Sequence, residues 1–583
     1  MIGRFGPLVT AEGTLFRLWA PKAEVVRLEV DGADAGAMNR GPDGWHRLLH
    51  PAGPGSRYRF VLPDGLKVPD PASRFQPEGV HGPSEVVAPL PPPGPPWAGR
   101  PWEEVVLYEL HVGTFTPEGT FRAAIERLPH LADIGVTAVE IMPVAAFPGE
   151  RNWGYDGVLL FAPAMPYGRP EDLKALVDAA HGHGMAVLLD VVYNHFGPEG
   201  NYLPLYAPLF NEVHETPWGA AVNFDAEGRD EVRAFAVENA LFWLEHYGFD
   251  GLRLDAVHEI RDHSANHILA EIAAAVARLP SDRPLHLIVE NEDNEPAWLR
   301  RDYRAQWNDD VHHALHVAVT GENEGYYGDY AGRADRLARA LAEGFAFQGE
   351  PMPYRGSERG APCRDLSPTA FVAFLQNHDQ IGNRAFGDRI AHGADAAAVR
   401  AATAAFLLSP QIPLLFQGEE WGASAPFQFF CDLGDDLKDA VRDGRRAEFQ
   451  RFSAFADPER RAAIPDPTAR ETFLASKLDW SERTRPPHAE TLAWYRRILA
   501  VRRARIVPLL AAMAAGEGAV TETGVITVTW RSGDCRLSLL LNLSPEGRRH
   551  GAAPAGEALW SEGSGWSDGR LGPWTALWSI ERA

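Results

Sequence analysis

Charged and polar residues follow short apolar runs at several points along the chain, and their types could perform acid–base and nucleophilic chemistry. In the run GLRLDAVH, side chains alternate so that Arg253 and Asp255 share one face while Leu252 and Leu254 share the other. The two charged residues are about 7 Å apart at Cα by strand rise, a distance that an arginine can span. Its positive charge would keep Asp255 ionised, as a carboxylate nucleophile requires. A buried structural salt bridge is the alternative for this pair taken alone.

Two further carboxylates follow apolar runs. HLIVENED places Glu290 directly after a run, where neighbouring carboxylates would raise its pKa and suit it to act as a general acid. Glu292 has the same parity and is the competitor, interpreted as a loop charge or a helix cap. FVAFLQNHD ends in Asp379, which could accept hydrogen bonds from sugar hydroxyls and keep Glu290 protonated by repulsion.

Imidazole groups accompany these carboxylates. DVVYNH brings Asp190, Asn194 and His195 to the end of a run, and His378 precedes Asp379. Together the two histidines are interpreted as donors to sugar hydroxyls, although either alone would more often be structural. A metal-dependent hydrolase that uses Asp190, His195, His378 and Asp379 as ligands is the alternative, and it predicts loss of activity with a chelator. No Asp-rich oxygen cage is evident, so we predict no metal and no other cofactor.

Eight apolar runs separated by helical stretches would position these residues. Strand–helix alternation predicts parallel strands with helical crossovers, and eight units over this length indicate a closed (β/α)8 TIM barrel. An open doubly wound sheet is the alternative. The carboxyl ends of barrel strands carry the active site, and several polar strand ends on that face would be costly to bury as simple caps. The runs lie at 105–112, 138–144, 186–195, 251–258, 286–292, 305–310, 371–379 and 412–420.

Regions of β pattern flank the predicted barrel. Residues 1–95 are expected to form an N-terminal β-sandwich that resembles carbohydrate-binding domains, followed by the Pro/Gly-rich segment at 89–101, interpreted as a stiff linker. The catalytic barrel is predicted over 96–504, with a short insertion after the third strand at about 196–223. Residues 505–583 are predicted to form a C-terminal β-sandwich.

Composition and charge exclude several classes of protein. The 583 residues are 45% hydrophobic and 23% charged, which is typical of globular proteins, and the net charge of −23 disfavours nucleic acid and anionic lipid as partners. The three cysteines, Cys363, Cys431 and Cys535, form no disulfide or zinc pattern. No apolar run approaches the ~18 residues of a membrane span, and the first residues lack a signal-peptide pattern. We therefore expect a cytoplasmic protein.

Four motifs taken in order, DVVYNH, GLRLDAVH, the glutamate of LIVEN, and NHD, resemble those of the α-amylase family of glycoside hydrolases and transferases. The resemblance implies that Asp255 is the nucleophile, Glu290 the general acid and base, and Asp379 the stabiliser of the transition state. It also implies a retaining double displacement, with the two reacting carboxyls about 5–5.5 Å apart. The substrate-binding residues that it implies are Tyr155, His195, Arg253, His258 and His378.

Within this family, segments at 69–86, 193–203, 305–327 and 416–430 are most similar to the malto-oligosyltrehalose trehalohydrolases. That similarity extends from about residue 12 onward. It implies hydrolysis of the α-1,4 bond next to the terminal trehalose of maltooligosyltrehalose or a related α-glucan, and coupling to a maltooligosyltrehalose synthase. Leaving-group contacts are then expected from the loops after strands four to eight, where the candidates include Trp307, Asp309 and Glu419.

Three other functions remain open at this point. A 1,4-α-glucan branching enzyme, or another glucan hydrolase of the α-amylase family, would share the motifs. A glucan-binding protein with a degenerate barrel is a third alternative, which the intact trio of acids disfavours. The chain departs from the trehalohydrolase pattern in one tract. Cys431, Asp432 and Leu433 stand where that group is expected to have Thr-Asp-His, so the side chains that line this loop are in question.

Overall fold

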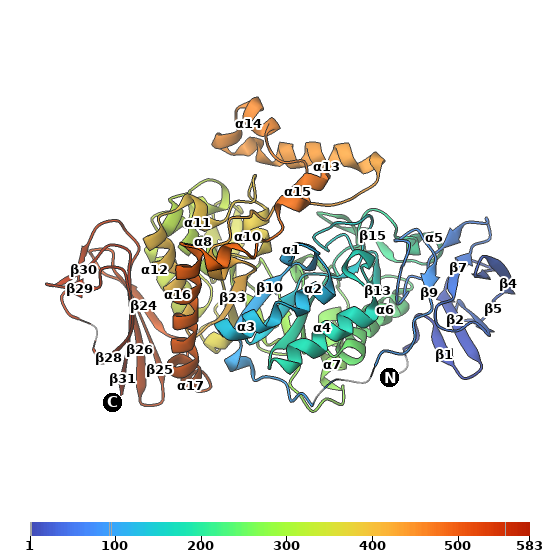
Figure 1. Ribbon diagram of the computed structural model, residues 1–583, viewed down its shortest axis with the longest axis horizontal. Helices are drawn as coiled ribbons and strands as arrows, with labels where there is room; N and C mark the ends of the chain where they lie inside the picture. Colours follow the sequence, from blue (N-terminus) through green and yellow to red (C-terminus); the bar gives the residue numbers. More distant parts are fainter. Residues whose placement is uncertain (1–2, 92–93, 95, 554, 583) are drawn as a thin grey trace.

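The computed structural model describes residues 3–91, 94, 96–553 and 555–582, and it places a barrel between two β domains (Figure 1). Eight parallel strands close the barrel, each paired in register with its neighbours along the chain and the last with the first. All eight lie within the predicted runs, so the barrel is confirmed and the open sheet is wrong. The strands are β10 (Leu107–Leu110), β11 (Ala138–Ile141), β14 (Ala186–Val191), β17 (Gly251–Leu254), β18 (His286–Val289), β19 (Ala305–Trp307), β22 (Phe371–Ala373) and β23 (Ile412–Phe416).

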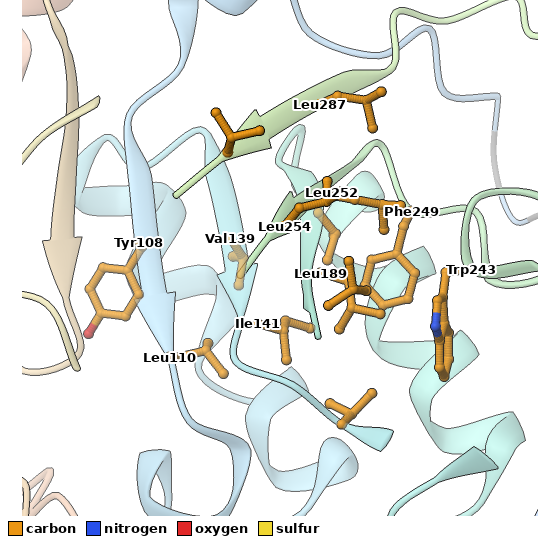
Figure 2. Close-up of a cluster of buried hydrophobic side chains, with 14 of the residues drawn as sticks. Tyr108, Leu110, Val139, Ile141, Leu189, Trp243, Phe249, Leu252, Leu254 and Leu287 are labelled. Atoms are coloured by element: carbon orange, nitrogen blue, oxygen red, sulfur yellow. The ribbon is translucent and has the colours of Figure 1, made fainter. Parts of the chain in front are cut away.

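Helices surround the barrel because each strand presents an apolar outer face. Leu252 and Leu254 of β17 point outward and belong to one core with Leu189, Phe249 and Trp243 (Figure 2). Each such side chain contributes about 1.5–3 kcal/mol when fully buried. The principal covering helices are α3 (Leu128–Ile134), α4 (Pro170–Gly182), α6 (Arg229–Phe242), α7 (Ile268–Ala277), α8 (Asp309–Thr320), α9 (Ala334–Glu343), α12 (Ala396–Leu407) and α16 (His488–Val501).

The barrel interior consists of an apolar layer below a charged one. Leu107, Ala186 and Leu188 belong to a buried apolar cluster. Two positions further along their strands, the inward residues are charged: Glu109 follows Leu107, and Asp190 follows Leu188. Because side chains alternate along a strand, Glu109 and Asp190 point into the barrel as Leu107 and Leu188 do, but one layer closer to the carboxyl ends of the strands.

The N-terminal β domain is a sandwich of two antiparallel sheets, with strand orders β1-β2-β6-β5 and β4-β3-β7-β8, and β9 paired to β7. Residues 92, 93 and 95 of the predicted linker lie outside the described residues, and the rest of 89–101 contains neither helix nor strand. The strands are β1 (Leu8–Thr10), β2 (Gly13–Trp19), β3 (Arg27–Val30), β4 (Ala33–Ala37), β5 (Asn39–Arg40), β6 (Trp45–His50), β7 (Arg57–Val61), β8 (Lys67–Val68) and β9 (Ser84–Glu85).

The C-terminal β domain has a five-stranded sheet, ordered β24-β25-β26-β31-β28. It also has a small sheet of β27 (Arg548–Arg549), β30 (Arg570–Leu571) and β29 (Trp566–Ser567). Helix α17 (Val507–Leu510) precedes it, so the exact boundary at 504 stays a prediction. The larger strands are β24 (Glu517–Val520), β25 (Ile526–Ser532), β26 (Cys535–Asn542), β28 (Glu557–Glu562) and β31 (Thr575–Arg582).

Three excursions leave the barrel at its carboxyl face. The predicted insertion after β14 contains α5 (Leu203–Tyr206) and a hairpin of β15 (Phe210–Thr216) and β16 (Gly219–Val222). A second hairpin, of β20 (Glu350–Met352) and β21 (Ser357–Arg359), was not predicted from the sequence. Neither was a helical excursion that projects from the barrel in Figure 1. Its helices α13 (Asp435–Glu448), α14 (Pro458–Ala462) and α15 (Arg470–Ala475) bury few side chains, so they carry little periodic apolar signal.

No helix among the described residues is both long and apolar enough to cross a membrane.

Candidate active site

A cavity of about 560 Å³ opens at the carboxyl ends of the barrel strands. Eight of the eleven residues predicted from the sequence line it: Tyr155, His195, Asp255, His258, Glu290, Asp309, His378 and Asp379. They follow several different strands, so the barrel brings together side chains that are far apart in the chain. Arg253, Trp307 and Glu419 do not line the cavity.

Arg253 lies at the centre of the site, fully buried beneath the cavity. Its Nη1 atom is 2.9 Å from Asp255 Oδ1 and 2.7 Å from Asp190 Oδ2, and its Nη2 atom is 2.9 Å from Glu290 Oε2. The two predicted reacting carboxyls therefore contact one guanidinium at one end of the barrel. The Arg253 guanidinium rests on the Trp307 ring, 4.0 Å from its centroid, and cations are attracted to aromatic faces.

The turn after β17 fixes both carboxyls. Asn194 Nδ2 donates to Asp255 Oδ2 at 2.9 Å and also to the backbone oxygen of Asp255. Ala256 has φ of +39°, in the left-handed region, and its N–H donates to Glu290 Oε2 at 2.8 Å. This conformation costs a residue with a Cβ about 1–2 kcal/mol. Strain of this kind persists where the surrounding structure enforces it, often at a functional site.

The protonation of the carboxyl pair differs from the sequence expectation. Burial raises the pKa of Asp255, and the negative charge of Glu290 raises it further. Burial also acts to raise the pKa of Glu290, but Arg253, His258 and the Ala256 N–H together outweigh it and leave this pKa below its ordinary value. The expected rise for Glu290 is therefore wrong for the free site. The prediction assumed that Arg253 acts on Asp255 alone, whereas its second nitrogen contacts Glu290.

The third carboxyl, Asp379, lies beside a charged histidine. His378 Nε2 is 3.5 Å from Asp379 Oδ1. The backbone N–H of His378 donates to Glu109 Oε2 at 3.0 Å, and the ring Nδ1 contacts Glu109 Oε1. Burial alone would lower the pKa of His378, but the charges of Asp379 and Glu109 raise it to about 9. Burial raises the pKa of Asp379. Glu109 was not among the residues predicted from the sequence, although its inward-facing position in the first run could have identified it.

Tyr155 and His195 form one wall. The Tyr155 ring stacks on His378 with centroids 5.0 Å apart and an interplanar angle of 20°, and its hydroxyl donates to Asp190 Oδ2 at 2.6 Å. His195 Nε2 lies 3.0 Å from the backbone oxygen of Tyr155. Burial lowers the pKa of His195 to about 4, so its imidazole is neutral at pH 7. The exposed Trp218 ring stacks on His195, with centroids 4.7 Å apart.

The metal-ligand alternative does not fit the residues proposed for it. Asp190 is engaged by Arg253 and Tyr155, and His378 is engaged by Glu109. Among the described residues, the sole group of three or more side chains placed to share a metal ion lies elsewhere, and it consists of His214, Asp225 and His263.

Three of the predicted substrate-binding residues need correction. Arg253 is buried beneath the cavity, where it contacts carboxyls and does not line the sugar site. Trp307 is buried under Arg253, where its ring supports the guanidinium and does not face the cavity. Glu419 is also buried, and its carboxyl accepts from the Phe416 N–H at 3.2 Å and from the Tyr495 hydroxyl of α16 at 3.2 Å. Gly418, with φ of +79°, turns the chain immediately before Glu419. The polar end of that strand is thus directed toward a helix and away from the sugar site.

The unusual Cys431–Leu433 tract does not line the cavity. Cys431 and Leu433 are buried, and Asp432 forms an ion pair with Arg151 at 2.8 Å. From this loop, Phe429 reaches the cavity. The three residues that depart from the trehalohydrolase pattern therefore lie behind the cavity wall and do not line the cavity.

Asp309 and a set of loop residues complete the cavity. Burial and the negative charge of Glu290 raise the pKa of Asp309 to about 8, and Gln380 Nε2 donates to Asp309 Oδ1 at 3.2 Å. The loop residues could not be predicted, because irregular segments have no periodicity to indicate which side chains face inward. They include Trp218 from the β15–β16 hairpin and Met352, Tyr354 and Arg355 at the β20–β21 hairpin.

A closed parallel barrel whose carboxyl face carries two acids on one arginine, and a third acid beside a charged histidine, defines the α-amylase class of glycoside hydrolases. Residues 74–204 match the family model described as "Alpha amylase, catalytic domain". Residues 513–578, in the C-terminal β domain, match a domain of unknown function.

Curated relatives identify the family within this class. A malto-oligosyltrehalose trehalohydrolase from Deinococcus radiodurans is 47% identical over 504 residues, which cover 85% of this chain and 82% of the relative. The enzyme of that name from Saccharolobus solfataricus is 41% identical over 512 residues, covering 86% and 87%. The chain belongs to the malto-oligosyltrehalose trehalohydrolase family.

Solved structures share the fold, and a more distant relative matches part of the chain. A Salmonella typhimurium crystal structure described as an alpha amylase superposes with a TM-score of 0.95 at 46% identity, covering 100% of both chains. A pullulanase from Anoxybacillus sp. LM18-11 complexed with maltotriose shares the fold at a TM-score of 0.72 and 18% identity, covering 99% of this chain and 86% of that one. A 1,4-alpha-glucan branching enzyme from Bacillus caldolyticus is 34% identical but covers 42% of this chain and 41% of its own.

Proposed function

We propose that this chain is a retaining glycoside hydrolase that cleaves the α-1,4-glucosidic bond next to the terminal trehalose of maltooligosyltrehalose and releases trehalose. The observation that supports the chemistry is the shared contact of Asp255 and Glu290 with Arg253 beneath the cavity. Membership of the trehalohydrolase family supports the substrate.

In the first step, Asp255 attacks the anomeric carbon of the glucosyl unit that is linked to trehalose. The glycosidic bond breaks as the new carbon–oxygen bond forms, and Glu290 gives its proton to the departing trehalose oxygen. In the second step, water attacks the same carbon, Glu290 takes the water proton, and Asp255 leaves. Two inversions at one carbon give net retention.

The reaction needs the proton on Glu290 and the charge on Asp255, whereas the free site favours the reverse arrangement. Glu290 is held in its ionised form mainly by Arg253. When Glu290 turns toward a glycosidic oxygen it leaves that guanidinium, and its pKa rises. Arg253 then acts on Asp255, whose pKa falls. Substrate binding would therefore move the shared proton to the residue that must donate it.

The remaining cavity residues are proposed to hold the sugars. His378, Asp379, His195 and Tyr155 surround the glucosyl unit that reacts, with the charged His378 donating to a hydroxyl and Asp379 accepting from others. His258 and Asp309 are proposed to contact the leaving trehalose, and none of these contacts depends on a metal. With a pKa of about 8, Asp309 is mainly protonated at pH 7 and can both donate and accept.

Two further proposals follow from this function. The substrate requires a synthase that builds trehalose onto the end of a maltodextrin, so this chain is proposed to act after such an enzyme. A cytoplasmic location is proposed because glucan stores and their precursors are intracellular substrates, and cell fractionation would test it.

The test is product analysis on maltooligosyltrehalose and on a plain maltodextrin of matched length. Trehalose should appear from the first substrate, and the freshly formed glucan end should have the α configuration by NMR. Asp255→Asn and Glu290→Gln should each lower kcat by at least about 10³-fold while binding is retained. Glu295→Gln, an exposed carboxyl in the same loop as Glu290 and outside the cavity, is the matched control.

The same assay separates the alternatives within the family. A branching enzyme would transfer glucan segments to another chain and would create α-1,6 branches from the plain maltodextrin. Efficient turnover of that maltodextrin, or inversion at the new end, would contradict the proposed function.

A further inference from the structure

The β15–β16 hairpin forms part of the cavity wall although it belongs to the insertion after β14. Trp218, at its turn, lines the cavity and stacks on His195. The hairpin has two short strands whose register is irregular between Phe210 and Glu215. An isolated two-stranded hairpin is marginally stable in water. The position of Trp218 therefore depends on whatever holds the hairpin against the barrel.

Three potential metal ligands meet at this place from separate segments. His214 is on β15, Asp225 precedes α6, and His263 is in the loop that follows β17. Asp225 Oδ2 lies 3.5 Å from His214 Nε2 and 3.3 Å from His263 Nδ1. One donor atom from each residue lies within 4.8 Å of the other two. None of the three lines the catalytic cavity.

The two spacings from Asp225 Oδ2 match those of a tetrahedral metal site. Bonds of 2.0–2.2 Å to nitrogen and oxygen place neighbouring ligand atoms about 3.3–3.5 Å apart. Imidazole with a single carboxylate suits Zn²⁺ and its neighbours, whereas Ca²⁺ and Mg²⁺ prefer several oxygen ligands.

The surroundings also orient the carboxylate. Asn211 Nδ2 donates to Asp225 Oδ1 at 2.7 Å, which leaves Oδ2 facing the two imidazoles. Hydrogen bonds of this kind to a ligand carboxylate are a regular feature of metal sites and strengthen binding. The His263 N–H also donates to Oδ2, at 3.0 Å, and this contact positions the loop that carries the third ligand.

We propose that His214, Asp225 and His263 bind one divalent transition-metal ion of the Zn²⁺ type, with water in the fourth position. The ion links the hairpin to the start of α6 and to the loop that follows the nucleophile strand. It fixes the hairpin, and with it Trp218, at the mouth of the active site. The site is separate from the glycosidic chemistry, and its test does not depend on which glucan the enzyme cleaves.

The binding test uses chelator-treated full-length protein titrated with ZnCl₂ in a calorimeter. We expect one equivalent to bind per chain, and His214→Ala and His263→Ala should each weaken binding by at least about 100-fold. Asn211→Ala should weaken it about 10–100-fold. His183→Ala, which removes an exposed histidine at the end of α4, should leave it unchanged.

Three results would overturn the proposal. They are no stoichiometric Zn²⁺ binding, binding that both histidine variants retain, and binding of Mg²⁺ as tight as that of Zn²⁺. Co²⁺ provides a second measurement, because a four-coordinate site of this kind gives intense visible absorption. The wild type should show that absorption, and His263→Ala, which alters an exposed side chain, should lose it.

Proteolysis tests the link to the hairpin. Glu212 and Glu215 are exposed on β15, so a glutamate-specific protease can report opening of the hairpin. With Zn²⁺ at 100 times its Kd, cleavage there should slow by about 100-fold in the wild type and should not change in His214→Ala. Equal cleavage rates with and without Zn²⁺ in the wild type would refute the clamp.

Discussion

The buried pair of Glu109 and His378 gives a quantitative prediction for Glu109→Gln. Asp379 and Glu109 together keep His378 charged against the effect of burial, and removing the charge of Glu109 should lower the pKa of His378. Other buried histidines show the result, since burial lowers the pKa of His111 to about 3 and of His195 to about 4. In Glu109→Gln, where Asp379 alone opposes burial, a smaller fraction of His378 should therefore be charged at pH 7.

The expected magnitude follows from the pKa of His378, which is about 9 in the fold against 6.5 for an ordinary histidine. Each pKa unit corresponds to 1.36 kcal/mol, so the charged imidazole stabilises the fold by about 3 kcal/mol. Because the folded pKa is raised, this stabilisation is complete below about pH 6.5 and is lost as the pH rises through about 9. Breaking a buried pair by removing one partner costs about 3–5 kcal/mol, in agreement.

Urea unfolding of wild type and Glu109→Gln at several pH values between 6 and 10 measures this effect. The difference in unfolding free energy should reach at most about 3 kcal/mol at pH 6.5, because Asp379 supplies part of the stabilisation, and should shrink markedly by pH 10. His378→Gln and the double variant complete a double-mutant cycle. The control is Glu104→Gln, which alters a more exposed carboxyl three residues before β10. A difference that stays constant across this range would refute the reasoning, because it would show that His378 carries no charge in the fold.

Three other substitutions test the site. Glu140→Gln should increase the unfolding free energy at pH 7 by about 1–3 kcal/mol, and this gain should vanish near pH 4. Burial raises the pKa of Glu140, so the folded protein keeps a proton that the unfolded chain releases above about pH 4.5. Denaturation at both pH values measures the difference. Trp218→Ala should raise KM for maltooligosyltrehalose about 5–30-fold with kcat nearly unchanged, since stacking of a sugar on one indole face is worth about 1–2 kcal/mol. Steady-state kinetics in which only kcat falls would contradict this. Arg253→Lys should lower kcat about 10²–10³-fold, because an ammonium cannot hold both carboxyls as the guanidinium does; wild-type kcat would exclude that role.

Strand periodicity accounts for what the sequence could predict. Each of the eight runs is short and apolar, and its inward parity is visible without knowledge of the fold. That is why the positions of Arg253, Asp255 and Glu290 could be anticipated at one face of a barrel. The alternation of side chains along a strand shows which ones face the barrel interior, but it does not show how far each lies below the cavity. Trp307 has the right strand and the right end, yet it lies beneath Arg253 and is covered by it.

Contacts between loops account for what the sequence could not predict. Trp218 reaches the cavity because the β15–β16 hairpin folds over His195, and no local pattern encodes that direction. His214, Asp225 and His263 have no motif spacing, since three separate segments bring them together. Electrostatic predictions failed for a related reason, because the pKa of Glu290 depends on the second nitrogen of Arg253.

The charges around the cavity favour a cationic transition state. Arg253 is flanked by three acids, Asp190, Asp255 and Glu290, so one guanidinium is shared among more negative charge than it can neutralise. Burial raises the pKa of Asp190 to about 6, and burial together with the negative charges of Glu290 and Asp190 raises that of Asp255 well above its ordinary value, so a further negative charge is costly here. Positive charge that develops on the sugar ring relieves that cost, whereas a neutral bound glucan does not. The site therefore stabilises the oxocarbenium-like transition state more than the substrate, which is the condition for catalysis.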